Sequence, residues 1–162
     1  MTLGTALAVV VAAIAFVALD PSDDSTVPQD AYNLAIDQNC VRHKKQIAAA
    51  QRDALALGGQ AGVSRFADSL VPIAGEWRMD LGRATVPIDR SEAVAALDTA
   101  LLEVEIQAGT LARVAREADG RATLASAARV DAASQQVEAA VEALELERCE
   151  LLSVEVGSLV QR

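Results

Sequence analysis

Apolar residues recur every three or four positions along most of this chain, and this spacing constrains its fold more than any other feature. Such a stripe places apolar side chains on one face of an α-helix. The first stripe comprises Tyr32, Ile36, Cys40, His43, Ile47, Ala50, Ala54 and Leu57. It predicts a helix that begins near Asp30 and stops at Gly58-Gly59, where two glycines favour a turn.

Three further stripes predict three more helices. The second comprises Phe66, Leu70, Ile73, Trp77, Leu81 and Ala84. The third comprises Val94, Leu97, Leu101, Val104, Ala108, Leu111, Ala115 and Ala118. The fourth comprises Leu124, Ala127, Val130, Val137, Ala140 or Val141, and Leu144. Pro72 lies inside the second stripe, which predicts a helix that is kinked or split there.

Local signals mark where the later helices begin. Asp89, three residues before Glu92, predicts a capping-box-like start for the third helix. Asp119-Gly120 predicts the turn before the fourth. Because short connections between long helices favour antiparallel neighbours, we expect an all-α fold in which residues 31–149 form an up-down four-helix bundle. Residues 150–162 fit no stripe and are expected to form a C-terminal tail.

The N-terminal segment is apolar on every face. Residues 3–19 carry no charge and only Gly4 and Thr5 are not apolar, which predicts contact with membrane lipid. Residues 1–19 are therefore interpreted as a transmembrane anchor or a signal peptide. We favour the anchor, although Ala13-Ile14-Ala15 fits a cleavage pattern and cleavage of residues 1–15 would yield a secreted protein.

Residues 20–30 combine two prolines with several aspartates and predict a solvated tether. The first basic residue after the apolar segment is Arg42. Because cytoplasmic flanks carry Lys and Arg, the bundle is expected on the extracytoplasmic side of the cell membrane, with a single pass through it.

Two cysteines stand near the ends of the predicted bundle. Cys40 lies on the inward stripe of the first helix, and Cys149 lies at the end of the fourth. Antiparallel helices would bring these ends together, so a disulfide is expected, with two unpaired buried thiols as the alternative.

These residues also carry a resemblance. Tyr32 and the pair Ala35-Ile36 precede Cys40, and Leu146 precedes Cys149. With the apolar N-terminus and acidic tether, this arrangement resembles a broad group of small helical envelope proteins from GC-rich bacteria, most of them uncharacterised. The resemblance implies an exported, membrane-tethered helical domain with paired terminal cysteines, and no activity. Members often carry a lipidation cysteine at the front and a glycine before the last cysteine, and both are absent here.

Several other residues are of types that can carry chemistry. The sole histidine, His43, and Met79 could in principle hold a haem, but a semi-buried or membrane-facing structural His43 is favoured. The carboxylates Glu138, Glu142 and Glu145 share a helix face and are interpreted as solvated. The run from Arg42 to Lys45 could meet anionic headgroups or an acidic patch of another protein, but it encircles its helix, so such a specific contact is not favoured. No cofactor and no metal are expected.

Composition narrows the function classes. The 14 Lys and Arg residues against 23 Asp and Glu residues give a net charge of -9, which argues against nucleic-acid binding. The sequence therefore predicts a non-enzymatic interaction or envelope-structural module with an unidentified protein partner and possible self-association. The alternative is a ligand-sensing bundle with a pocket near Phe66 and Trp77.

Overall fold

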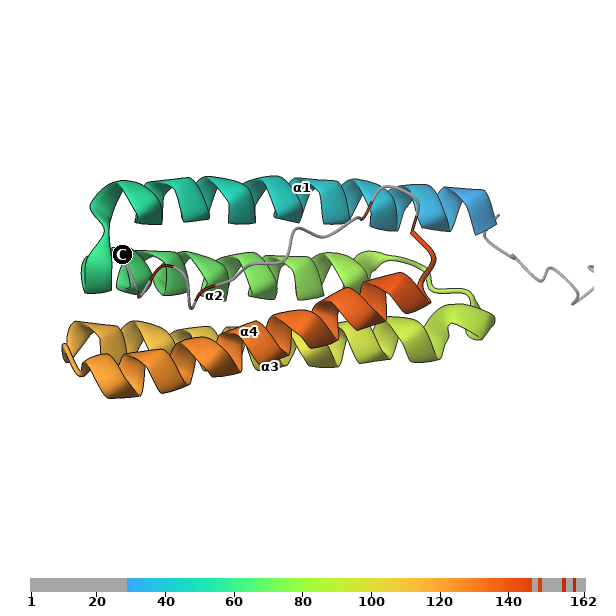
Figure 1. The fold of residues 1–162 in the computed structure, drawn as a ribbon. Helices are drawn as coiled ribbons and strands as arrows, with labels where there is room; N and C mark the ends of the chain where they lie inside the picture. The colour runs from blue at the N-terminus through green and yellow to red at the C-terminus, as the bar shows by residue number, and fades with distance from the viewer. Residues whose placement is uncertain (1–28, 147–148, 150–155, 157–158, 160–162) are drawn as a thin grey trace, which may run out of the picture.

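A computed structural model describes residues 29–146 together with Cys149, Val156 and Leu159. Its helices are α1 (Gln29–Leu57), α2 (Gly59–Arg83), α3 (Ser91–Arg116) and α4 (Gly120–Ala143), with a 3₁₀ turn, η1 (Ile88–Arg90), before α3. Successive helices run in opposite directions and lie side by side (Figure 1). All regular structure in the described part of the chain is helical, which confirms the predicted all-α bundle.

The turn between α1 and α2 lies where the glycines predict it. Gly58 and Gly59 adopt positive φ angles of 67° and 53°, which glycine reaches without steric cost. Gly62 then lies against the end of α1, because a Cβ placed on it would be 2.3 Å from the Ala54 carbonyl oxygen. The missing side chain lets the two helices meet closely at this end.

The turn before α4 is also as predicted. The Asp119 carboxylate accepts hydrogen bonds from the backbone N–H groups of Arg121 and Ala122, both at 3.0 Å. These bonds satisfy two of the donors that a helix start leaves without a partner, so Asp119 acts as the N-cap.

Of the two outcomes predicted at Pro72, a kink or a split, the split does not occur, and the predicted capping box is wrong. The helix α2 continues through Pro72 without a split, because buried residues on both sides of Pro72, including Leu70 and Ala74, pack into the bundle. The capping box at Asp89 and Glu92 does not form. Asp89 belongs to η1 instead, and the helix α3 begins after Arg90 without a side-chain cap.

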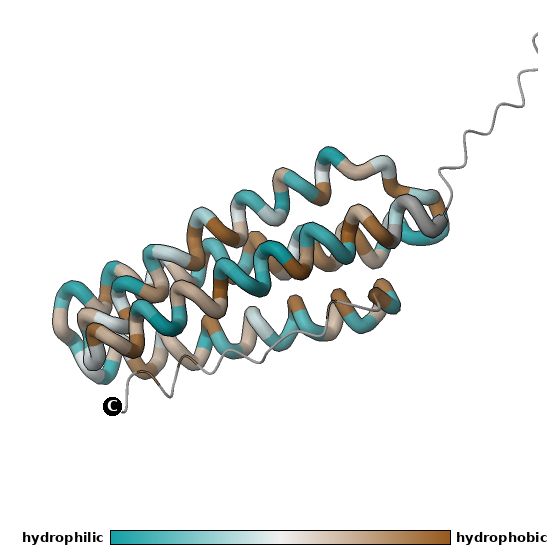
Figure 2. Tube along the Cα trace, turned by 90° about the horizontal axis from the view of Figure 1, so that it is seen from above, coloured by the Kyte–Doolittle hydropathy of each residue, from teal (hydrophilic) through white to brown (hydrophobic). Residues whose placement is uncertain are grey.

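The core is built from small aliphatic side chains around a few larger ones. Hydrophobic residues recur at short intervals along each helix (Figure 2). One buried cluster surrounds the disulfide and Trp77, with Ile36, Leu97 and Leu144 among its members. A second cluster surrounds Phe66 towards the opposite end of the helices. The two aromatic residues therefore belong to different clusters.

The bundle closes differently from the prediction. The helix α1 packs on α2, α2 on α3 and α3 on α4, whereas α1 and α4 make almost no direct contact. Residues beyond α4 bridge this side. Val156 and Leu159 are buried in the second cluster together with Ala50 and Ala54 of α1. The backbone N–H of Val156 donates to the Asp131 carboxylate of α4 at 2.7 Å.

Val156 and Leu159, which fall within the predicted tail of residues 150–162, therefore belong to the core, and the other residues of that tail lie outside the described residues. Cys149 itself lies past the end of α4 at Ala143, whereas the sequence predicted it at the end of that helix. The predicted anchor (residues 1–19) and most of the predicted tether (residues 20–28) lie outside the described residues. None of the described helices is long and apolar enough to span a membrane.

Candidate functional site

A disulfide between Cys40 and Cys149 crosslinks the chain at one end of the bundle. The two Cα atoms are 5.6 Å apart, and 109 positions separate the residues in the chain. Both cysteines are buried among Ile36, Leu144 and neighbouring apolar side chains. The bond joins α1 to the chain beyond α4, across the side of the bundle where those two helices do not pack.

His43 lies one helical turn after Cys40, and its side chain is fully buried. The imidazole stacks on the indole of Trp77, with ring centroids 5.3 Å apart and planes 15° from parallel. Its Nδ1 lies 2.7 Å from the Oε1 of Gln46. Gln46 in turn donates from Nε2 to the Glu76 carboxylate at 3.3 Å. A membrane-facing His43 is therefore excluded.

The second ring nitrogen of His43 meets a charged pair. Its Nε2 lies 3.0 Å from the Oδ2 of Asp80 on α2. Arg42 forms an ion pair with the same carboxylate oxygen, and Arg83 contacts the other oxygen at 3.4 Å. The basic run therefore takes part in an ion pair within the molecule, between Arg42 and Asp80, which the sequence did not predict. These interactions fasten α1 to α2 beside the disulfide.

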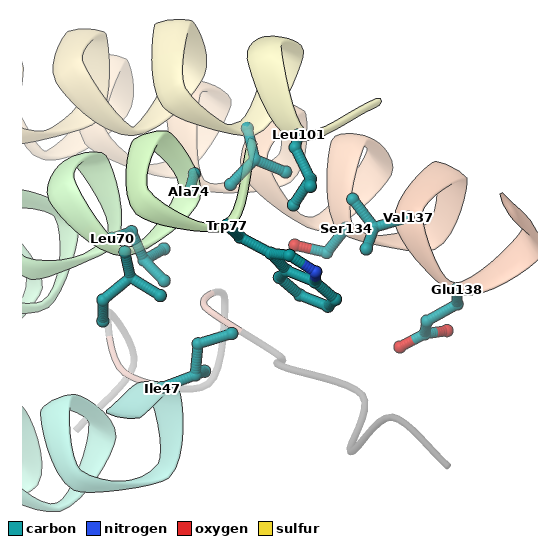
Figure 3. A pocket seen from close by; sticks show the side chains of 10 residues that line it. Ile47, Leu70, Ala74, Trp77, Leu101, Ser134, Val137 and Glu138 are labelled. Atoms are coloured by element: carbon teal, nitrogen blue, oxygen red, sulfur yellow. The ribbon is translucent and has the colours of Figure 1, made fainter. Parts of the chain in front are cut away.

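Trp77 also lines a small cavity between the helices (Figure 3). The other lining residues are Ile47, Leu70, Ile73, Ala74, Leu101, Val104, Ser134, Val137 and Glu138. The indole nitrogen lies on the side of Ser134 and Val137 (Figure 3). Trp77 is only 1% exposed, and its Nε1 has no hydrogen-bond partner among the described residues.

The size of this cavity limits what it can hold. Its volume is about 50 Å³, whereas pockets for drug-sized ligands measure roughly 300–1,000 Å³. A buried N–H beside a hydroxyl and a carboxylate is the polar setting in which ordered water is found. The sequence expected a pocket near both Phe66 and Trp77, but Phe66 does not line it.

The remaining candidate residues do not form a site. Met79 is 56% exposed, so it does not share the interior with His43 as a haem ligand would. Glu145 lies past the end of α4 and contacts Arg90, so it does not continue the helix face of Glu138 and Glu142. Within the described residues, no group of three potential metal ligands comes together.

The ion pairs between α2 and α3 hold the helix that carries Trp77. Arg78 donates to Asp98 at 3.0 Å and to Glu105 at 3.3 Å. Its hydrogen bond to Asp98 is the main cause of the raised pKa of the Arg78 guanidinium. Because Arg78 follows Trp77 directly, these pairs fix the position of α2 from the side opposite α1.

His43 and Trp77 each stood on a predicted inward stripe, but their stacking could not be read from the sequence. Asp80, Gln46 and Glu76 were missed entirely. A polar residue three positions after His43 and an aspartate three after Trp77 were the available signals, and such spacing is common on solvated helix faces. Comparison with protein-family models, curated proteins and solved structures found no match.

Proposed function

We propose that this protein is a non-catalytic, exported helical bundle that acts by binding another protein or by supporting an envelope assembly. In this proposal residues 3–19 contact the membrane and hold the bundle on its extracytoplasmic side. The apolar N-terminal segment and the acidic tether support the tethering. The resemblance to small envelope proteins points the same way.

The disulfide is the observation that most supports this proposal. Such bonds persist in oxidising spaces and are rare in the cytosol, where thiols are kept reduced. Cys40 and Cys149 are buried within one cluster, and their bond closes a side of the bundle that helix packing leaves open. A bond with this structural position fits a protein that folds after export.

Thiol labelling of protein taken directly from the native host tests the export. We expect that a maleimide reagent, added to freshly denatured cells before reduction, labels neither cysteine. After reduction both become labelled. The Cys149→Ser variant is the matched control, because it leaves one free thiol that reacts without reduction. Labelling of both cysteines before reduction, in a protein that fractionates with the cytosol, would overturn the proposal.

Crosslinking in the native membrane tests the interaction role. We expect a discrete partner that is recovered with the full-length protein after mild crosslinking. The variant Cys40→Ala/Cys149→Ala, made at matched abundance, should lose most of that partner because its bundle is loosened. Self-association would appear in the same experiment as a crosslinked product containing only this chain. Recovery of neither species counts against an interaction module.

A second function has one specific observation behind it. The indole N–H of Trp77, which has no hydrogen-bond partner among the described residues, belongs to a side chain that lines a cavity, as in a site that binds a small hydrogen-bond acceptor. The cavity volume of about 50 Å³ restricts a ligand to a few non-hydrogen atoms. Trp77 is the only tryptophan, so its fluorescence reports on this cavity alone. Saturable emission changes with short alcohols or amides would favour this function, and unchanged emission and melting temperature would remove it.

A further inference from the structure

The hydrogen bonds around His43 determine where its protons lie. The Nε2 of Gln46 donates to Glu76, which leaves the Gln46 Oε1 facing the Nδ1 of His43 at 2.7 Å. An amide oxygen can only accept a hydrogen bond, so the Nδ1 of His43 carries a proton. The orientation of Gln46 is thus set from α2, through Glu76.

The other ring nitrogen of His43, Nε2, faces a hydrogen-bond acceptor, and the neighbouring donor has no hydrogen left for it. The Nη2 atom of Arg42 lies 3.3 Å from the Nε2 of His43. However, Nη2 has only two hydrogens, and its contacts with Asn39 and Asp80 use both. The Asp80 carboxylate, 3.0 Å from the His43 Nε2, accepts hydrogen bonds. In this arrangement Nε2 is itself the donor, and the ring is doubly protonated.

We propose that His43 is a proton-operated latch between α1 and α2. The imidazolium donates to Gln46 on its own helix and to Asp80 on α2, and so ties the helices together. After loss of the Nε2 proton, a lone pair faces the Asp80 carboxylate. Because the ring is fully buried, it cannot replace the lost hydrogen bond by one to water. Arg42 or Asp80 must therefore move, and the contact between α1 and α2 loosens.

Charged side chains of both signs surround the ring of His43. Arg42 from α1 and Asp80 from α2 face it directly, with opposite effects on the imidazolium. Arg83 contacts Asp80, Glu76 contacts Gln46, and Glu138 of α4 lines the cavity beside Trp77. The positive and negative neighbours are paired with one another. Adding or removing one proton on His43 then changes the net charge of the cluster by one unit.

The disulfide limits how far the latch can open. Cys40 lies one turn before His43 and is bonded to Cys149, so α1 stays attached when the pairing with Asp80 is lost. The change is then a local loosening of α1 around Trp77, whose ring stacks on His43. This latch goes beyond the proposed function and does not depend on it, because it follows from the contacts between α1 and α2 alone.

Nuclear magnetic resonance of the full-length protein tests the latch without any substitution. The chain has one histidine and one tryptophan, so each ring gives a single set of signals. At pH 5.5 we expect ring ¹⁵N shifts typical of a doubly protonated imidazole. Towards pH 8 we expect Nε2 to lose its proton, the Trp77 indole signal to shift and the protection factors of the α1 amides, which are corrected for the intrinsic exchange rate at each pH, to fall. A neutral ring at pH 5.5, or deprotonation that leaves the indole and α1 unchanged, overturns the proposal.

Variants assign the effect to His43. Because loss of the Nε2 proton ends the pairing with Asp80, the protection factors of the α1 amides should fall between pH 5.5 and 8. The His43→Gln variant, which does not titrate there, should lack this fall. Lys45→Gln on the exposed face of α1 is the matched control and should retain it. An equal pH dependence in the wild type and His43→Gln would contradict the latch.

Discussion

At the scale of single residues, this protein contains two buried polar groups that lack a hydrogen-bond partner among the described residues: the Tyr32 hydroxyl and the Trp77 indole N–H. An unpaired buried polar atom costs free energy, because it gives up its bonds to water and gains none from the protein. The sequence placed both residues on inward stripes. It gave no indication of which polar atoms would find partners, because these lie on other helices.

Substitution of Tyr32 by phenylalanine tests the unpaired hydroxyl. Burial raises the pKa of Tyr32, and Arg90 opposes this effect. Near pH 7 we expect Tyr32→Phe to keep the wild-type stability or gain up to about 1 kcal/mol in free energy of unfolding, because the hydroxyl has no partner to lose. Urea denaturation measures this difference.

The same residue predicts a pH dependence. The folded-state pKa lies above the unfolded value of about 10, so the wild type keeps its full stability below that pH. As the pH rises through the folded-state pKa, the unfolded state ionises more readily and the wild type loses stability relative to Tyr32→Phe. A loss of more than about 1 kcal/mol in the variant at pH 7 would show that the hydroxyl has a partner, and parallel alkaline profiles would show that burial does not raise its pKa.

At the scale of elements, the sequence predicted helices and glycine turns well and interruptions poorly. The positions of Gly58, Gly59 and Asp119 were correct because their effects are local: a positive φ angle in one case and an N-cap in the other. Pro72 was expected to kink or split its helix. It does not split α2, because the residues around it are buried against other helices, and tertiary packing outweighs the lost backbone hydrogen bond.

The close approach of α1 and α2 predicts opposite effects for two glycines of one helix. Gly62→Ala should reduce the free energy of unfolding by about 1–3 kcal/mol, because the new Cβ collides with the backbone of Ala54. Gly82→Ala is the matched control, with nothing within 4 Å of its Cβ, and should gain up to about 1 kcal/mol. Thermal or urea denaturation of the two variants measures the difference. Equal effects would show that α1 and α2 do not meet closely at Gly62.

At the scale of the whole molecule, the chain beyond α4 completes a bundle that its four helices leave open. Val156 and Leu159 share a cluster with residues of α1, and Cys149 is bonded to Cys40. This arrangement replaces direct packing of α1 on α4. The sequence predicted the cysteine pairing from antiparallel helices, and the structure forms that pair although Cys149 lies outside α4.

The disulfide is expected to supply a large share of the stability. The Cys40→Ala/Cys149→Ala variant should lose about 2–5 kcal/mol, since the bond closes a long loop and restricts the unfolded chain. Urea denaturation of the oxidised protein, the reduced protein and the variant provides the comparison. The reduced wild type should resemble the variant. A midpoint that changes neither on reduction nor on substitution would mean that helix packing alone holds α1.

The sequence by itself determined the helices and their order, because apolar periodicity, glycine and aspartate act over a few residues, and it left the pairing of the two cysteines as an expectation. It also predicted most of the side chains that point inward, His43 and Trp77 among them, although Leu57, Ala118 and Leu124 on the predicted stripes are exposed. Only the tertiary structure decided that these two rings stack, that Asp80 meets His43, and that residues beyond α4 close the bundle. Each of these contacts joins positions far apart in the chain, and local spacing carries no information about which distant residue will fill a given space.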